Sequence, residues 1–180
     1  MQNWEEWQYA YRFGVVLILP PEPIRSRVNA LRRKYDPRSQ SYCDAHISLT
    51  VPLPRAPEVN DWVELEAAAL AVQSFSIHYG PLKPFLPNLG GAFHIEPQAE
   101  IDSLRRSLEA SAIFANAGPR KYQFWAHMTV AEFISAEMNK ELLADSAVKN
   151  LSGSFVCDRI WHMVPDDRFH FVEQRQLSLR

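Results

Sequence analysis

The chain has 180 residues, of which 47% are hydrophobic and 22% charged; these proportions are typical of a globular protein with a sizeable core and exclude the disordered and fibrous classes. Its 19 Lys and Arg residues nearly balance 21 Asp and Glu residues, giving a formal net charge of −2, so no overall basic field is available to hold a long nucleic acid backbone. The sequence shows neither a secretory signal nor an apolar run long enough to cross a bilayer, and Cys43 and Cys157 lack Cys-x-x-Cys spacing; we therefore expect a cytoplasmic protein with reduced thiols and no membrane partner.

The first half of the chain predicts a strand, a helix, a strand, a helix and a third strand. The apolar run 13–19 is followed by two prolines, which indicates a short buried strand. Apolar side chains then recur at helical spacing over 24–35, with basic residues such as Arg32 expected on the outer face. The other expected elements of this half are a strand over 44–52, a helix over 60–73 with Asn60 as its N-cap, a strand over 75–79 and a proline-marked loop over 81–91.

The second half approximately repeats this order, which predicts an α+β fold with two pseudo-symmetric lobes. We expect a single domain over 1–180, with lobe-like halves of about 1–90 and 91–180. Each lobe should contain an antiparallel-rich sheet and helices, with the active cleft between the lobes. The expected elements of this half are a strand over 92–95, a helix that begins at Pro97, a strand over 123–133, a helix from its cap Ser135 to about Lys149, and a terminal hairpin of strands 155–164 and 169–179.

Two of the expected strands carry imidazole and hydroxyl side chains on one face. In the first, side-chain alternation places His46, Ser48 and Thr50 on one face and aliphatic residues on the other. His127 and Thr129 repeat the arrangement in the second half. Each motif follows a predicted strand and helix of similar length, which makes the pair a much stronger signal than one isolated His-x-Thr sequence.

Two imidazoles and two hydroxyls that face each other across a cleft suit the cleavage of a phosphodiester. Because histidine titrates near neutral pH, one imidazole can take a proton from the attacking oxygen while the other protonates the leaving oxygen. The neighbouring hydroxyls can donate hydrogen bonds to the phosphate oxygens and stabilise charge in the transition state. This scheme needs no metal, no covalent nucleophile and no cofactor.

The sequences His-Ile-Ser-Leu at 46–49 and His-Met-Thr-Val at 127–130 resemble the paired motifs of the two-histidine (2H) phosphoesterase superfamily, which includes 2′-5′ RNA ligase-like proteins and cyclic phosphodiesterases. The resemblance covers nearly the whole chain in the order of its elements. It implies a bilobal α+β fold and metal-independent opening of 2′,3′-cyclic phosphates. By position, it implies that His46 and His127 are the acid–base pair and that Ser48 and Thr129 bind the phosphate.

Five further residues are candidates for contact with the substrate: Thr50, Trp125, Tyr42, Arg120 and Lys121. Thr50 and Tyr42 share the strand face of the first motif, and Trp125 shares that of the second. The indole could stack on a base, although filling core space is an equal alternative. Arg120 and Lys121 precede the second motif and could meet a phosphate, whereas charged loop residues are usually only solvated.

Other chemistry-bearing residues are interpreted as structural. Cys43 is disfavoured as a nucleophile because His46, three residues away on a strand, points to the opposite face. The aromatic residues near the N-terminus are expected to cover an edge of the core or a partner surface: Trp4, Trp7, Tyr9 and Tyr11. The remaining histidines lack a hydroxyl at the motif spacing and a metal-ligand pattern, although His94 and Glu96 could form a metal pair: His78, His94, His162 and His170.

The paired motifs predict a phosphodiesterase, and the resemblance implies that its substrate is a nucleoside 2′,3′-cyclic phosphate or an RNA end; no obligate protein partner is evident. Two alternatives remain open at this point. The same residues could join or cleave 2′-5′ linkages in a longer RNA, or the cleft could bind a phosphorylated nucleotide or RNA end without turnover. The sequence does not distinguish which histidine is the base and which is the acid.

Overall fold

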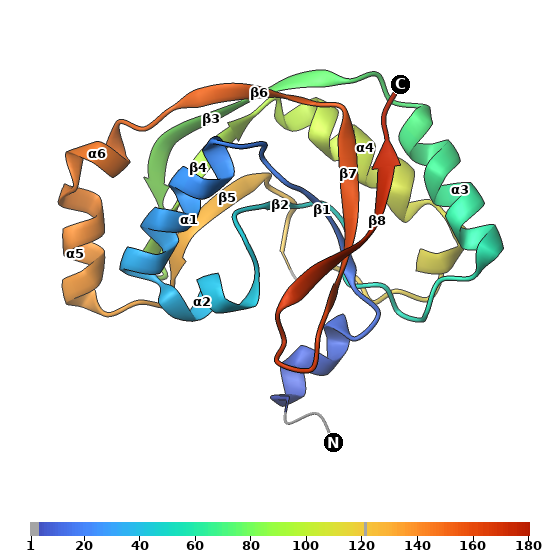
Figure 1. Ribbon diagram of the computed structural model, residues 1–180, viewed down its shortest axis with the longest axis horizontal. Coiled ribbons are helices and arrows are strands. Elements are labelled where there is room, and N and C mark those ends of the chain that lie inside the picture. Colours follow the sequence, from blue (N-terminus) through green and yellow to red (C-terminus); the bar gives the residue numbers. More distant parts are fainter. Residues whose placement is uncertain (1–3, 121) are drawn as a thin grey trace.

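Two four-stranded sheets form the framework of the protein, which the computed structural model describes over residues 4–120 and 122–180 (Figure 1). The first sheet has the strand order β2-β1-β7-β8 and the second the order β5-β4-β3-β6, and the strand pairs in both are antiparallel. The strands that carry the two motifs, β2 and β5, are edge strands that lie against each other. This meeting of two sheet edges brings together motifs that are far apart in the sequence.

Each sheet is assembled from distant parts of the chain. The first sheet contains β1 (Val15–Ile18), β2 (Ile47–Ser48), β7 (Arg159–Pro165) and β8 (Phe171–Ser178). The second sheet contains β3 (Phe75–Pro84), β4 (Gly90–Glu96), β5 (His127–Glu132) and β6 (Gly153–Cys157).

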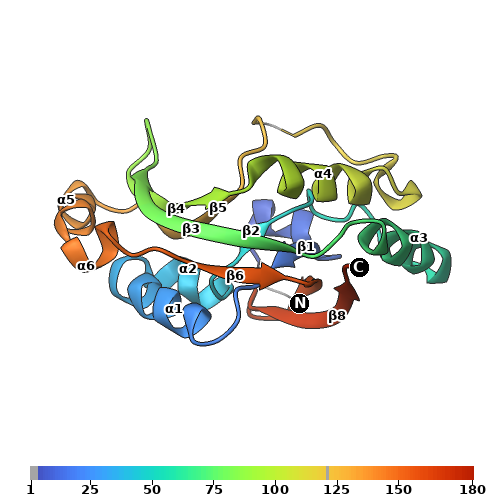
Figure 2. The same cartoon turned by 90° about the horizontal axis from the view of Figure 1, so that it is seen from above.

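Helices pack on both sheets and at both ends of the molecule. The α-helices are α1 (Ile24–Tyr35), α2 (Pro37–Tyr42), α3 (Val59–Leu70), α4 (Gln98–Glu109), α5 (Ala136–Ala144) and α6 (Ser146–Lys149), and two 3₁₀ helices are η1 (Glu6–Tyr11) and η2 (Ala112–Phe114). Helix α1 packs against β5, and α3 packs against β8 and α4. Figures 1 and 2 show α3 and the pair α5–α6 at opposite ends of the molecule. No helix in the described part of the chain has both the length and the apolar character needed to cross a membrane.

Strand β1 is buried on both faces because each face packs in a different apolar cluster. Val16 and Phe93, both 0% exposed, belong to the main core that the two sheets share. On the opposite face of β1, Leu17 packs with Phe169 in a second, aromatic-rich cluster. Strands buried on both faces read as continuous apolar runs rather than alternating patterns, which explains the run at 13–19.

The predicted α+β class with two lobes is confirmed, but the two sheets do not coincide with the halves 1–90 and 91–180. Strand β3 comes from the first half and lies inside the second sheet, whereas β7 and β8 return to complete the first. The predicted strand 155–164 is in fact two strands, β6 and β7, that belong to different sheets. An apolar run alone does not show where a chain passes from one sheet to another.

Three local predictions were also wrong. Helix α3 is capped by Glu58 rather than Asn60, because the Glu58 backbone amide pairs with the Asp61 side chain. Strand β3 continues through the predicted loop at 81–84, since Pro81 lies at an irregularity in the β3–β4 register where its missing N–H is tolerated. The helix from Ser135 ends at Ala144, because the Asp145 carboxylate accepts the Ala147 amide and begins α6.

Gly90 fixes the start of β4 beside β5, and we expect Gly90→Ala to be strongly destabilising. Its φ of +138° is unfavourable for a residue with a Cβ, and an added Cβ would lie 2.2 Å from the Ala131 carbonyl oxygen. The free energy of unfolding, measured by urea denaturation, should fall by about 2 kcal/mol or more. Gly118→Ala is the matched control because nothing lies within 4 Å of its added Cβ; equal urea midpoints for the two variants would contradict this account.

Candidate active site

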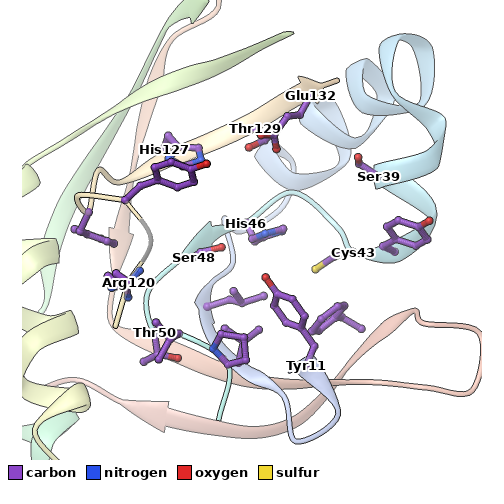
Figure 3. A pocket seen from close by; sticks show the side chains of 18 of the residues that line it. Tyr11, Ser39, Cys43, His46, Ser48, Thr50, Arg120, His127, Thr129 and Glu132 are labelled. Atoms are coloured by element: carbon purple, nitrogen blue, oxygen red, sulfur yellow. The ribbon is translucent and has the colours of Figure 1, made fainter. Parts of the chain in front are cut away.

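A cleft with a volume of about 620 Å³ lies where the two edge strands meet, and both motifs line it. Figure 3 shows the side chains of His46 and Ser48 on one side and of His127 and Thr129 on the other. The apolar residues that alternate with them, such as Ile47 and Met128, are 0% exposed. The predicted alternation of cleft-facing and core-facing residues therefore holds over 46–49 and 127–130, although the regular strand β2 is only two residues long.

The two imidazoles are held in the same way. Nδ1 of His46 lies 2.6 Å from the Asp44 carbonyl oxygen, and Nδ1 of His127 lies 2.7 Å from the Trp125 carbonyl oxygen. A carbonyl oxygen only accepts, so each Nδ1 carries the proton and donates it. Each Nε2 is then left with its lone pair for a ligand. In both motifs the carbonyl belongs to the residue two positions before the histidine, because both chain segments have the same extended arrangement.

Burial and charge make the two histidines unequal. Burial lowers the pKa of His46 to about 4, and the positive charge of Arg32 is the second cause of this shift, with His127 also contributing. Burial lowers the pKa of His127 as well, against the opposing effect of its bond to the Trp125 carbonyl. Only His46 has a nearby guanidinium among the causes of its shift, so His46 is the imidazole held more strongly in its neutral form.

Arg32 joins the two motif segments from beneath the cleft. Its guanidinium donates to the carbonyl oxygens of Thr129 at 2.8 Å, Ser39 at 3.0 Å and Cys43 at 3.1 Å, and to the Gln40 side chain at 3.2 Å. The residue is 2% exposed, so the prediction that it lies on the outer face of its helix was wrong. Arg32 stands one helical turn after the buried Val28, and a basic residue at that apolar-face position was the signal in the sequence.

The hydroxyl residues of the first motif have different environments. Ser48 is exposed to the cleft, and its hydroxyl makes no hydrogen bond within residues 4–120 and 122–180. Thr50 is 3% exposed, and its Oγ1 accepts the Val16 backbone N–H at 3.1 Å. Thr50 therefore has a structural partner that accounts for its polarity, whereas Ser48 presents a free hydroxyl to a ligand.

The second motif is flanked by an aromatic stack. Trp125 stacks on His127 with ring centroids 4.9 Å apart and planes 23° apart, and Phe85 meets His127 edge-on. His94 also stacks on Trp125, while its Nε2 lies 2.8 Å from the Glu96 carboxylate. Trp125 thus supports the imidazole of His127, a contact that the sequence did not predict.

Arg120 lines the cleft, but protein groups already hold its guanidinium. It forms an ion pair with Glu109 at 2.6 Å, donates to the Leu49 carbonyl oxygen and lies over the Phe124 ring. Lys121, the other basic residue predicted beside the second motif, lies outside the described residues. Arg120 therefore ties its loop to the first motif segment.

An aromatic wall forms a further side of the cleft, and it includes residues that no sequence motif connects to the site. The wall consists of Trp7, Tyr11, Tyr42, Phe169 and Phe171. Four of these rings meet Phe169 edge-on or nearly so. The expectation that the N-terminal aromatic residues cover a core edge was correct only in part, because Trp7 and Tyr11 also line the cleft. No local pattern could show this, since the wall combines both ends of the chain.

Cys43 lines the cleft but is poorly suited to act as a nucleophile. Burial raises the pKa of its thiol to about 12, so the reactive thiolate is scarce at neutral pH. Among the described residues, no three His, Cys, Asp or Glu side chains are grouped to hold a metal ion. The two motifs themselves contribute the imidazoles of His46 and His127 and the hydroxyls of Ser48 and Thr129 to the cleft.

Comparisons with known proteins agree with this geometry. The family model of the 2′-5′ RNA ligase superfamily matches residues 20–168, which include both motifs. Curated proteins of Bacillus cereus strain B4264 and Bacillus thuringiensis strain Al Hakam, both provisionally named phosphoesterases, are each 27% identical over 166 residues. Each alignment covers 91% of this chain and 88% of the relative.

Solved structures show the same fold at low sequence identity. The Escherichia coli LigT complex with 3′-AMP is 15% identical, has a TM-score of 0.62, and matches over 93% of this chain and 98% of LigT. TT0787 of Thermus thermophilus is 14% identical with a TM-score of 0.55, over 92% and 97% of the two chains. The bilobal architecture is thus shared with these proteins.

The different environments of Thr50 and Ser48 lead to a paired prediction. Thr50→Val removes the acceptor of the buried Val16 N–H, so the free energy of unfolding should fall by about 1–3 kcal/mol. Ser48→Ala removes an exposed hydroxyl without a protein partner and should leave it unchanged within about 0.5 kcal/mol. Urea denaturation of both variants measures the difference; a Thr50→Val protein as stable as the wild type would contradict a structural role for this hydroxyl.

Proposed function

The chain belongs to the 2′-5′ RNA ligase superfamily of 2H phosphoesterases, and we propose that it is a metal-independent phosphodiesterase that opens the 2′,3′-cyclic phosphates of nucleotides or RNA ends. One observation carries this proposal: two imidazoles with tethered Nδ1 atoms line one cleft, each with a hydroxyl two residues further along. A phosphoesterase activity is the coarser function that family membership supports. The cyclic substrate and the mechanism are the proposal.

In the proposed reaction, the neutral imidazole of His46 is the base. Its Nε2 takes a proton from water, whose oxygen attacks the phosphorus. The bond from phosphorus to one ribose oxygen breaks, and His127 in its protonated form gives a proton to that oxygen. The product is a ribose phosphate monoester, and the two histidines finish with their protonation states exchanged. This assignment follows from Arg32, which disfavours the charged form of His46.

The phosphate is proposed to lie between the imidazoles, where several donors converge. The hydroxyls of Ser48 and Thr129 face the cleft and can donate to the non-bridging oxygens. The buried Arg32 guanidinium also lines the cleft, and within the described residues all its hydrogen-bond acceptors are uncharged. Asp36 and Asp44 act on Arg32 electrostatically, but it forms no direct ion pair within those residues, so its positive charge can contribute to stabilising an anion.

The substrate class is supported by a relative. The Escherichia coli LigT structure was determined with 3′-AMP, a nucleoside monophosphate of the kind that opening a cyclic phosphate produces. The fold accommodates such a molecule in that protein. We propose the same class of ligand for the cleft described here.

The direct test is hydrolysis of the four nucleoside 2′,3′-cyclic phosphates, and of a short RNA ending in one, in the presence of EDTA. His46→Ala and His127→Ala should each lower the rate by about 10²- to 10⁴-fold while the proteins remain folded. His78→Ala is the matched control because His78 is exposed on β3 and does not line the cleft.

Full activity in either cleft variant, or abolition of wild-type activity by EDTA, would contradict the mechanism. If no cyclic phosphate is hydrolysed, 2′-5′-linked RNA is the next substrate to assay. Tight binding without turnover across all these substrates would instead establish a binding module.

The inequality of the two histidines predicts a bell-shaped pH profile. The dependence of kcat/KM on pH reports the free enzyme, so the rate should fall below pH about 4 as His46 gains a proton. It should also fall as pH rises through the lowered pKa of His127, which places the optimum below neutral pH.

A positive charge disfavours the imidazolium, so Arg32→Gln should raise the pKa of His46 and move the acid limb to higher pH. Arg32→Lys is the charge-retaining control; an acid limb that stays in place in Arg32→Gln would contradict the electrostatic role.

A further inference from the structure

An irregularity in β5 turns an acidic side chain into the cleft. Thr129 pairs with Ala92 of β4, but Ala131 pairs with the adjacent Gly91, so two steps of β5 oppose one step of β4. Such a bulge shifts the side-chain alternation of the bulged strand by one position. Ala131 is consequently 0% exposed, and Glu132 lines the cleft on the same side as Thr129 (Figure 3). Regular alternation would have placed Glu132 on the core-facing side.

The Glu132 carboxylate has no hydrogen-bond partner in the part of the chain that the structure describes, although the residue is only partly exposed. Its neighbour Asp36 is already occupied, because the Asp36 carboxylate accepts the backbone amides of Ser39 at 3.0 Å and Glu132 at 3.0 Å. Burial, and then the charge of Asp36, raise the pKa of Glu132. Hydrogen-bond donors from a ligand would offset both the desolvation of the Glu132 carboxylate and its repulsion by Asp36, since N–H donors stabilise a partly buried carboxylate strongly.

The Tyr11 hydroxyl is a second cleft group without a hydrogen bond inside the described ranges. Burial raises the pKa of Tyr11, and the charge of Glu132 is the further cause, which places the two groups in electrostatic reach of each other. In Figure 3 the hydroxyl of Tyr11 points into the cavity, and Cys43 lies between Tyr11 and Ser39 in this view. Tyr11 stands in the aromatic wall beside Trp7 and Tyr42, where Trp7 is 48% exposed. This end of the cleft thus combines flat apolar rings, one acceptor and one hydroxyl donor.

We propose that this end of the cleft is a nucleobase subsite selective for guanine. The inference rests on the proposed function, in which the phosphate lies between His46 and His127. Because of the bulge, Glu132 lies only two steps of the paired strand β4 beyond Thr129, roughly 7 Å at the usual rise per residue, a separation that a nucleoside can span. The base would lie against the aromatic wall, as unpaired bases do on aromatic side chains.

Guanine is selected by the pattern of donors and acceptors. An ionised carboxylate only accepts hydrogen bonds, and guanine alone among the four bases presents two adjacent N–H donor groups, N1–H and the 2-amino group, on its Watson–Crick edge. Adenine and cytosine place an unprotonated ring nitrogen beside their amino group, and uracil flanks its single N–H with carbonyl oxygens; both arrangements set a lone pair against the carboxylate. The Tyr11 hydroxyl can donate to O6 of guanine.

The test compares kcat/KM for guanosine, inosine and adenosine 2′,3′-cyclic phosphates. The wild type should prefer guanosine over adenosine by about 10- to 100-fold, as expected for a bidentate contact, with inosine between them because it lacks the 2-amino group. Glu132→Gln should abolish or reverse this preference, since a carboxamide offers one donor and one acceptor that match adenine. Tyr11→Phe should lower guanosine turnover more than adenosine turnover. Glu137→Gln, on the exposed side of α5, is the matched control and should leave the preference unchanged.

The outcomes separate this inference from the proposed function. Turnover without a base preference, or a guanosine preference that survives Glu132→Gln, would overturn the guanine subsite and leave the phosphodiesterase mechanism intact. If no cyclic phosphate is hydrolysed, the proposed function fails, and calorimetric binding of guanosine and adenosine 2′-monophosphates decides the subsite alone. Guanosine binding at least 10-fold tighter, and lost in Glu132→Gln, would support the subsite, and equal dissociation constants would overturn it.

Discussion

The buried guanidinium of Arg32 is the interaction on which the site depends. It reaches the carbonyl of Thr129 on β5 and the carbonyls of Ser39 and Cys43 ahead of the first motif, so one side chain ties β5 of the second sheet to the segment that leads into β2 of the first. Burying such a group is costly unless its donors are satisfied, and four of its five N–H groups have protein acceptors. Buried contacts, rather than surface loops, therefore set the geometry of the cleft.

The same residue links packing to chemistry. Because its acceptors are uncharged, Arg32 contributes a positive charge to the floor of a cleft in a protein whose formal net charge is −2. Local charge, not the balance of the whole chain, then decides which ligands the cleft attracts. The charge acts differently on the two imidazoles, so a nearly symmetric pair of motifs carries two histidines with unequal environments. The two strands place the imidazoles, and in the proposed mechanism the charge of Arg32 distinguishes the base from the acid.

Much of this arrangement follows from the sequence because it depends on local periodicity. Alternation along 44–52 and 123–133 places the histidines and hydroxyls on one face, and the helical spacing over 24–35 gives α1 its observed bounds. The prediction places Arg32 on the outer face because basic residues on a helix are ordinarily solvated, and only its acceptors in the segment 39–43 and on β5 make its burial favourable. The helical spacing shows that Arg32 shares the face of the buried Val28, but not which distant carbonyl oxygens accept from its guanidinium.

The parts of the site that the sequence did not predict depend on long-range pairing. Glu132 enters the cleft through a bulge that exists only in the register between β4 and β5, and strict alternation places it on the wrong face. The aromatic wall joins η1 to the β7–β8 turn region, which meet because β7 pairs with β1. Sheet order is likewise set by partners distant in sequence, which is why the two sheets do not follow the halves of the chain.

The central claim is that two imidazoles, each tethered through Nδ1 to a backbone carbonyl, present Nε2 to a phosphate in one cleft. Nitrogen-15 NMR of the histidine side chains, titrated from pH 3 to 8 with and without a nucleoside 2′-monophosphate, tests it most directly. The account predicts the Nδ1–H tautomer for both neutral rings, a lower pKa for His46 than for His127, and a rise in both pKa values when the phosphate binds. Nε2–H tautomers, or pKa values that the ligand leaves unchanged, would contradict it.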